Sequence, residues 1–225
     1  MRRMLSHFEG VSLTAAHSQA ARLTCESPDL PKPGQGFLAL KPGVNQPLRR
    51  TLFPTSIHLD GFTADVPPHP SWSFGDPIDL VGPLGGGFTP PREAVRWLLV
   101  SIAAPPLRLL PLMELGLNQN VAISLWSEPP LDELPPQVEV NPSLGDALSW
   151  ADYLALDLPL DSLQELRLFL GITDRNRLPP FAQALIMTPM PCGIGTCHAC
   201  SIKGDVGWLL TCSDGPIFDL NRMSW

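Results

Sequence analysis

Residues 192–212 read CGIGTCHACSIKGDVGWLLTC, and this stretch holds four of the five cysteines in the 225-residue chain. Cys192, Cys197, Cys200 and Cys212 follow the pattern C-x4-C-x2-C-x11-C. The spacing C-x4-C-x2-C is that of plant-type [2Fe–2S] proteins, in which the fourth cysteine lies further along the chain. The sequence therefore predicts a [2Fe–2S] cluster held by these four thiolates. A C-terminal segment this short needs such a staple in order to fold.

Small residues stand between these cysteines. Gly193, Gly195 and Ala199 are expected where the backbone must approach the cluster closely or take a positive φ, so that N–H groups can point at its negative charge. His198 is a tempting ligand, but a Rieske centre needs two histidines, and the four cysteines already complete the site. We therefore expect His198 to be a surface residue or a neighbour of the ligands.

Two other uses of the cysteines are open. Structural zinc sites usually combine two closely spaced cysteine pairs, whereas this chain has one C-x2-C pair and a glycine-bearing x4 loop. Disulfides are disfavoured in a reducing compartment. Cys25 lies apart in an alternating pattern and is expected to be a small buried hydrophobe.

The whole chain reads as a folded protein of the cytoplasm. Hydrophobic residues make up 44% and charged residues 16%, and the formal charge of −7 gives no support for a nucleic-acid partner. No secretory signal is recognisable at residues 1–10. The most apolar stretch, 97–117, is interrupted by prolines and charges, so no membrane span is predicted. The 27 prolines limit how much of the chain can be long helix.

Three tracts follow a predicted N-terminal tail at 1–10. Residues 11–90 are expected to form an antiparallel β-barrel, 91–189 an α/β domain with a parallel sheet, and 190–225 the small cluster domain. The predicted strands are Ala20–Cys25, Gly36–Leu40, Ile78–Val81, Val95–Ile102, Val121–Trp126 and Ala182–Met187, and the predicted helices are Leu107–Leu117 and Leu160–Leu170.

Several motifs together resemble a known family. The run from Met190 to Cys200, followed by Cys212-Ser213-Asp214-Gly215-Pro216-Ile217-Phe218, looks like the cluster domain of the dihydroorotate dehydrogenase electron-transfer subunit. Val81-Gly82-Pro83-Leu84-Gly85-Gly86-Gly87-Phe88 is similar to the segment that ends the family's flavin-binding barrel, and Pro33-Gly34-Gln35 matches an early barrel turn. The resemblance implies a ferredoxin-reductase-like order of a flavin-binding barrel, a nucleotide-binding α/β domain and a cluster domain.

The resemblance also implies FAD on the barrel. In the family an R-P-x-S-I stretch contacts the flavin; here Arg50 is followed, after three residues, by Pro54-Thr55-Ser56-Ile57. The residues that would line the FAD site are Arg50, Pro54, Ser56, Ile57, Gly85, Gly86 and Gly87. On the motif alone, an ordinary basic turn before a strand and a glycine hinge are alternatives.

A nicotinamide nucleotide is not expected. Where the family has a glycine-rich turn that admits a pyrophosphate to a helix N-terminus, this chain has Val100-Ser101-Ile102-Ala103-Ala104-Pro105-Pro106. Side chains then occupy the approach surface, and two prolines remove N–H donors. We therefore expect no NAD site.

The sequence thus predicts an electron-transfer subunit of a dihydroorotate-dehydrogenase-like oxidoreductase. It would relay electrons between a partner flavoprotein, the cluster and FAD in a heteromeric complex, with a place in pyrimidine biosynthesis implied by the resemblance. No residue reads as a catalytic base, so substrate chemistry would belong to the partner. The alternative is a cluster-only docking or scaffold protein that has lost flavin and NAD binding.

Overall fold

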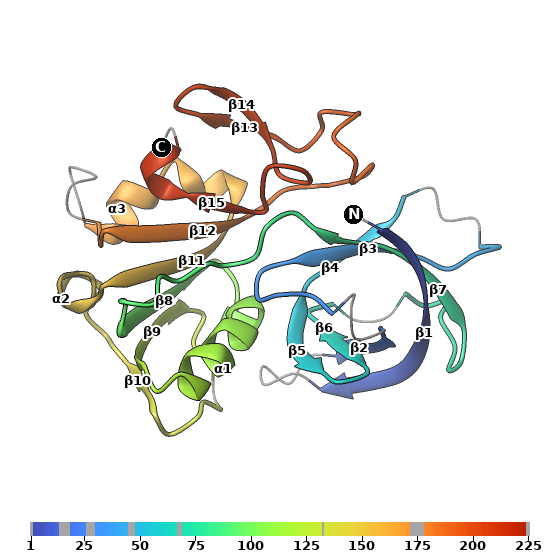
Figure 1. Ribbon diagram of the computed structural model, residues 1–225, viewed down its shortest axis with the longest axis horizontal. Helices are drawn as coiled ribbons and strands as arrows, with labels where there is room; N and C mark the ends of the chain where they lie inside the picture. Colours follow the sequence, from blue (N-terminus) through green and yellow to red (C-terminus); the bar gives the residue numbers. More distant parts are fainter. Residues whose placement is uncertain are drawn as a thin grey trace.

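The computed structural model describes residues 2–13, 19–25, 30–44, 48–66, 69–131, 133–171 and 178–223. Two sheets and a small hairpin organise these residues (Figure 1). The strands are β1 Arg2–Leu13, β2 Gln19–Thr24, β3 Gly36–Leu40, β4 Arg50–Leu52, β5 Pro54–His58, β6 Gly61–Ala64, β7 Pro77–Leu84, β8 Arg96–Ile102, β9 Ala122–Glu128, β10 Val138–Val140, β11 Tyr153–Pro159, β12 Phe181–Met187, β13 Ser201–Gly204, β14 Gly207–Leu210 and β15 Ile217–Asp219. The helices are α1 Leu110–Asn118, α2 Leu144–Trp150 and α3 Leu166–Leu170, with 3-10 turns η2 Pro106–Leu109, η3 Leu160–Leu163 and η5 Leu220–Arg222.

The first sheet is a curled antiparallel barrel in the order β4-β3-β7-β1-β2-β6-β5. Its edge strands β4 and β5 are consecutive in the chain, and only Phe53 separates them. Alternate residues point inward, and the interior is filled by large side chains such as Phe37 and Phe62, whose rings stack with centroids 4.9 Å apart. This is the antiparallel barrel that the sequence predicts.

The predicted N-terminal tail is wrong. Residues 2–13 form β1, which lies in the middle of the barrel sheet and pairs with β7 on one side and β2 on the other. Burial alternates along the strand, with Ser6 and Phe8 inside and the basic and acidic residues outside. The pattern was hidden because a serine takes an inward position while Leu5 faces solvent with 65% exposure.

The second sheet has the order β10-β9-β8-β11-β12-β15. The first five strands are parallel, as predicted, and β15 joins β12 in antiparallel orientation. Strands β8 and β11 are almost fully buried, and most of their residues are apolar. From β8 the chain builds outward to β9 and β10, then returns to the opposite side of β8 as β11. The point between β8 and β11 is therefore the topological switch point, where α/β sheets usually hold ligands.

One apolar core joins all three parts of the molecule. It contains Leu38, Phe53 and Leu84 of the barrel, residues of α1 and the sheet, and Met190, Cys200 and Cys212 from the C-terminal segment. Helix α1 lies between strand β9 and strand β5 of the barrel (Figure 1). The C-terminal segment also supplies β15 to the α/β sheet, so it is attached both to the shared core and to that sheet.

Among the described helices, none is both long and apolar enough to cross a membrane.

Candidate iron–sulfur site and interdomain crevice

The four predicted ligands lie around the β13–β14 hairpin. Cys192 and Cys197 stand in the loop after β12, Cys200 directly precedes β13, and Cys212 follows β14. At the base of the hairpin, Thr211 donates from its backbone N–H and its hydroxyl to the Cys200 carbonyl, at 3.1 and 3.0 Å. This closure brings Cys200 Sγ within 3.4 Å of Cys212 Sγ.

Cys192 and Cys197 form a second pair, since the Cys197 side chain is among the groups that lower the pKa of the Cys192 thiol. The loop also directs backbone N–H groups at Cys192 Sγ, from Ile194, Cys197 and Thr196. These donors, Ile194 first, lower the pKa of the Cys192 thiol to about 5. A sulfur with several N–H donors is prepared to be a thiolate, which is the form that binds iron.

The second pair has the opposite electrostatic environment. Burial, followed by the neighbouring Cys200 side chain, raises the pKa of the Cys212 thiol to about 12, while an N–H from Gly195 acts against the rise. Cys200 and Cys212 are 1% and 3% exposed, whereas Cys197 is exposed. One edge of the site therefore faces the core and the other faces solvent.

The pairing of the cysteines bears on the kind of metal centre. Among the residues that the structure describes, no three His, Cys, Asp or Glu side chains gather as ligands of one metal ion. The thiols stand as two pairs, Cys192 with Cys197 and Cys200 with Cys212. Each iron of a [2Fe–2S] cluster takes two protein ligands, so two pairs suit two irons. None of these four cysteines forms a disulfide.

Of the three small residues in the loop, Gly193 and Gly195 take the positive φ that the sequence predicts, and Ala199 does not. Gly193 and Gly195 have φ of +66° and +73°, and a Cβ on Gly193 would lie 2.3 Å from Leu38 Cδ1 of the barrel. The third positive φ belongs to His198 at +56°, not to Ala199. His198 is exposed, and its carbonyl accepts from Ser201 N and Oγ, so it has a local structural role.

The predicted flavin residues are divided between two environments. Arg50 is half-buried on β4, opposite Ala39 of β3. Pro54, Ser56 and Ile57 lie on β5, whose outer side packs against η2 and α1 of the α/β part. The Arg50 side chain forms no hydrogen bond or ion pair with any residue in the described part of the chain. The neighbouring Arg49 donates to the carboxylate of Asp79 at 2.6 Å.

The glycines after β7 make close contacts within the chain. Gly85 has φ +60°, and a Cβ there would lie 1.4 Å from Gly215 O. Gly86 N donates to Gly215 O at 3.2 Å. A Cβ on Gly87 would lie 2.7 Å from Pro33 O. Gly85 and Gly86 therefore hold the barrel against Gly215 of the C-terminal segment, while Gly87 packs on Pro33 within the barrel. Close contacts require glycine at Gly85 and Gly87 without any cofactor.

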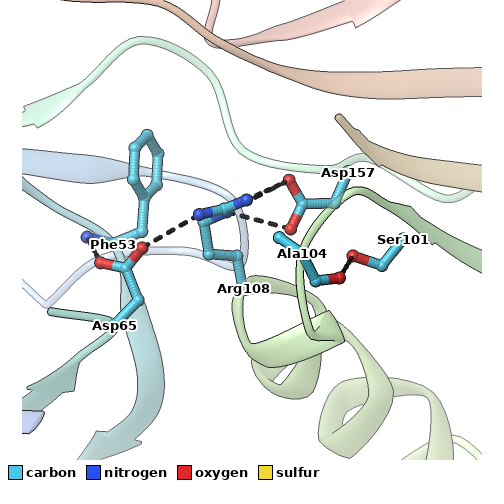
Figure 2. Close-up of polar contacts among 6 residues, drawn as sticks. All are labelled: Phe53, Asp65, Ser101, Ala104, Arg108 and Asp157. Atoms are coloured by element: carbon cyan, nitrogen blue, oxygen red, sulfur yellow. Dashed lines mark hydrogen bonds and ion pairs between the residues drawn. The ribbon is translucent and has the colours of Figure 1, made fainter. Parts of the chain in front are cut away.

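A charged cluster that the sequence did not reveal occupies the switch point of the α/β sheet. Ser101 and Asp157 are register partners at the carboxyl ends of β8 and β11. Arg108, from η2, reaches into this point and binds Asp157 and also Asp65 of the barrel (Figure 2). Arg108 is 49 residues from Asp157 and 43 from Asp65 in the chain, so no sequence spacing signals the cluster.

These parts define a class: a ferredoxin-reductase-like fold that carries a four-cysteine iron–sulfur domain. Residues 188–224 match the family model of the iron–sulfur cluster binding domain of dihydroorotate dehydrogenase B. This match confirms the resemblance of the C-terminal cysteine segment. No curated protein matches the chain as a whole.

Solved structures share the fold at low sequence identity. An NADH-dependent reduced ferredoxin–NADP oxidoreductase, studied for flavin-based electron bifurcation, has a TM-score of 0.72 at 17% identity, over 99% of this chain and 90% of that chain. Phthalate dioxygenase reductase has a TM-score of 0.57 at 12% identity, over 91% and 87%. The ferredoxin reductase of carbazole 1,9a-dioxygenase has a TM-score of 0.59 at 16% identity, over 80% and 68%.

Proposed function

We propose that this chain is a one-electron carrier whose redox centre is a [2Fe–2S] cluster on Cys192, Cys197, Cys200 and Cys212. The observation that carries the proposal is the β13–β14 hairpin, which brings Cys200 Sγ within 3.4 Å of Cys212 Sγ and has Cys192 and Cys197 in the loop that precedes it. The cluster would supply reversible one-electron chemistry when bound. The protein supplies the ligands, the N–H donors and the burial that tune the potential.

The exposed edge of the site supports exchange with a partner protein. Cys197 and His198 are exposed, and Ile194 leaves 55% of its surface in solvent beside them. The family of the C-terminal domain suggests the partner: a dihydroorotate-dehydrogenase-like flavoprotein that performs the substrate chemistry in a hetero-oligomer. No described residue is assigned a catalytic role in this proposal.

Two versions of the carrier differ in whether FAD joins the relay. The related solved structures include one described in connection with flavin-based electron bifurcation and one in an FAD apo form, which supports the version with FAD. The packing of β5 against η2 and α1, together with the charged cluster of Arg108, Asp65 and Asp157, favours the cluster-only version.

The test of the carrier function is a metal and sulfide assay with a redox titration. Protein purified under anaerobic conditions should contain about two irons and two sulfides per chain and should bleach reversibly on reduction. Zinc in place of iron, with no labile sulfide, would instead identify a structural zinc site and remove the proposed function.

A further inference from the structure

The switch point of an α/β sheet is where a dinucleotide or flavin is normally held, in a crevice outside the carboxyl ends of the strands. In this chain Arg108 fills that position. Its Nε donates to both carboxylate oxygens of Asp157, at 3.1 and 3.0 Å, and one terminal nitrogen donates to Oδ1 at 2.9 Å. The other terminal nitrogen donates to Asp65 Oδ2 at 3.2 Å. Figure 2 shows the guanidinium between the two carboxylates.

The cluster is removed from solvent and joins two parts of the molecule. The Asp157 side chain has no exposed surface, and those of Asp65 and Arg108 are 7% and 15% exposed. Asp65 follows β6 of the barrel, whereas Asp157 lies on β11 of the sheet. A bidentate guanidinium–carboxylate pair is a strong, geometrically specific interaction, so the crevice is bridged across its two walls.

Apolar packing continues the closure on the barrel side. The R-P-x-S-I motif has an arginine directly before its proline. In this chain the residue directly before Pro54-Thr55-Ser56-Ile57 is Phe53. Phe53 is 1% exposed and shares a core with Leu109, Leu112 and Met113 from the opposite wall. Its backbone N–H donates to Asp65 Oδ1 at 2.9 Å, which ties this position to the charged cluster.

The turn after β8 offers little to a phosphate group. Pro105 and Pro106 stand at the start of η2, where they lack N–H donors, and no side chain caps this turn. Ser101 Oγ, which faces the same turn, already donates to Ala104 O at 2.8 Å. The residues of this turn therefore do not fit the pyrophosphate of a nicotinamide dinucleotide, whereas Phe53 and Arg108 occupy the side on which FAD would lie.

We infer that this crevice is permanently closed by the chain's own side chains, with Arg108 in the place of a cofactor, and that the protein binds neither FAD nor a nicotinamide dinucleotide. Given the proposed cluster, on which this second part rests, the chain then holds a single redox centre. It accepts one electron from a donor and returns one electron to an acceptor, with no hydride or two-electron step. The barrel and the α/β part act as a rigid frame that presents the cluster to a partner.

The experiment uses the purified full-length protein with its cluster intact. Flavin is quantified after acid extraction, FAD is titrated in while its fluorescence is followed, and the protein is titrated anaerobically with dithionite. We expect no extracted flavin, no saturable quenching of FAD fluorescence and an uptake of one electron per chain. A flavin in the purified protein, a micromolar or tighter Kd for FAD, or an uptake near three electrons would overturn the closed crevice, because flavin adds two electrons to the one of the cluster.

A second arm treats the same sample with NADH and then with NADPH. We expect the cluster absorption to stay unchanged with both, and bleaching by either one would overturn the inference. The outcomes also separate this inference from the proposed function. Flavin together with iron and sulfide refutes only the closed crevice, whereas absence of both flavin and iron refutes only the carrier.

Discussion

Arg108 is the residue whose removal tests the charged cluster most directly. Replacing it with alanine leaves two carboxylates, Asp65 and Asp157, buried without their shared cation. We expect Arg108→Ala to lower the free energy of unfolding by about 3–5 kcal/mol at neutral pH, measured by urea denaturation. Arg92→Ala, at an exposed position, is the matched control and should change it by less than about 0.5 kcal/mol. Equal effects of the two substitutions would contradict the role given to Arg108.

The same cluster has a defined dependence on pH. Burial raises the pKa of Asp65 and of Asp157 above the usual value, and the positive charge of Arg108 counteracts that rise. A carboxyl with a raised folded-state pKa binds its proton more tightly when folded, so its contribution to stability is present at low pH and is lost as pH rises through that pKa. Without Arg108, its positive charge no longer counteracts the rise in the pKa of Asp65 and Asp157. We therefore expect the stability deficit of Arg108→Ala to shrink as pH falls from neutral, and a deficit that grows with acidification would refute this assignment.

The cysteines give the clearest residue-scale test of the site. Cys197 is exposed and makes no core contact, so Cys197→Ser should lose most of the iron while the fold is retained. Cys25→Ala is the matched control, because Cys25 lies inside the barrel, where its Sγ is 3.7 Å from Met4 Sδ. We expect this variant to keep its iron and sulfide. Loss of iron from both variants would mean that the effect is not specific to the predicted ligands.

At the scale of elements, the glycine segment after β7 is expected to be intolerant of side chains. Gly85→Ala would place a Cβ 1.4 Å from Gly215 O and keep a positive φ, so the barrel must separate from the C-terminal segment. The expected cost is about 3 kcal/mol or more, combining overpacking with left-handed strain. Gly43→Ala also has a positive φ, +79°, but has open space, and should cost only about 1–2 kcal/mol. The difference between the two denaturation midpoints measures the close contact itself.

The turn after β8 carries backbone strain that glycine would relieve. Ala103 has φ +61° although it stands where the related family has glycines. Ala103→Gly should therefore stabilise the protein by a few tenths to about 1 kcal/mol, since relief of left-handed strain exceeds the entropy that glycine loses. Ala104→Gly, at a neighbouring position without a positive φ, should destabilise it by a similar amount. A destabilised Ala103→Gly variant in thermal denaturation would contradict this account of the turn.

The elements that sequence patterns predicted are those with clear local signals. The strand Gly36–Leu40 is confirmed as β3, and the helix Leu107–Leu117 corresponds to η2 and α1. The helix expected at Leu160–Leu170 is wrong as a single element, because it is split into η3 and α3. Strand β11 was missed even though it lies at the centre of the sheet, since Asp157 and Pro159 break its apolar run. Asp157 is tolerated in this buried strand because Arg108 forms an ion pair with it. This contact exists only in the tertiary structure, so the sequence pattern could not reveal it.

The candidate functional residues also divide into those with a local sequence signal and those that only the fold brings together. The four cysteines could be predicted as ligands from the sequence because their spacing reflects the local geometry of one loop. Arg108, Asp65 and Asp157 come from three distant segments and share no motif, so only the folded chain brings them together. Phe53 stands directly before Pro54, but the sequence resemblance assigns the arginine of R-P-x-S-I to Arg50, so it does not predict a phenylalanine at the flavin face.

For the molecule as a whole, the shared core predicts that the barrel and the α/β part unfold together. Phe53 packs with Leu109 and Leu112, and Arg108 bridges Asp65 and Asp157 across the same boundary. Trp72 is buried in the barrel and Trp97 is buried on β8 of the α/β sheet. Each can serve as a fluorescence probe in a chain where the other tryptophans are replaced by phenylalanine. We expect coincident urea midpoints for the two probes.

The same probes distinguish a rigid frame from two domains joined only by the chain. Arg108→Ala removes the ionic bridge but leaves the shared core of Phe53, Leu109 and Leu112, so the Trp72 and Trp97 midpoints should fall together in this variant and stay unchanged in Arg92→Ala. Removing the cluster with a chelator should lower both midpoints together, because Cys200 and Cys212 belong to the core that the parts share. Midpoints that already differ in the unmodified protein would contradict the rigid frame, since a crevice between independently unfolding parts could open to admit a cofactor.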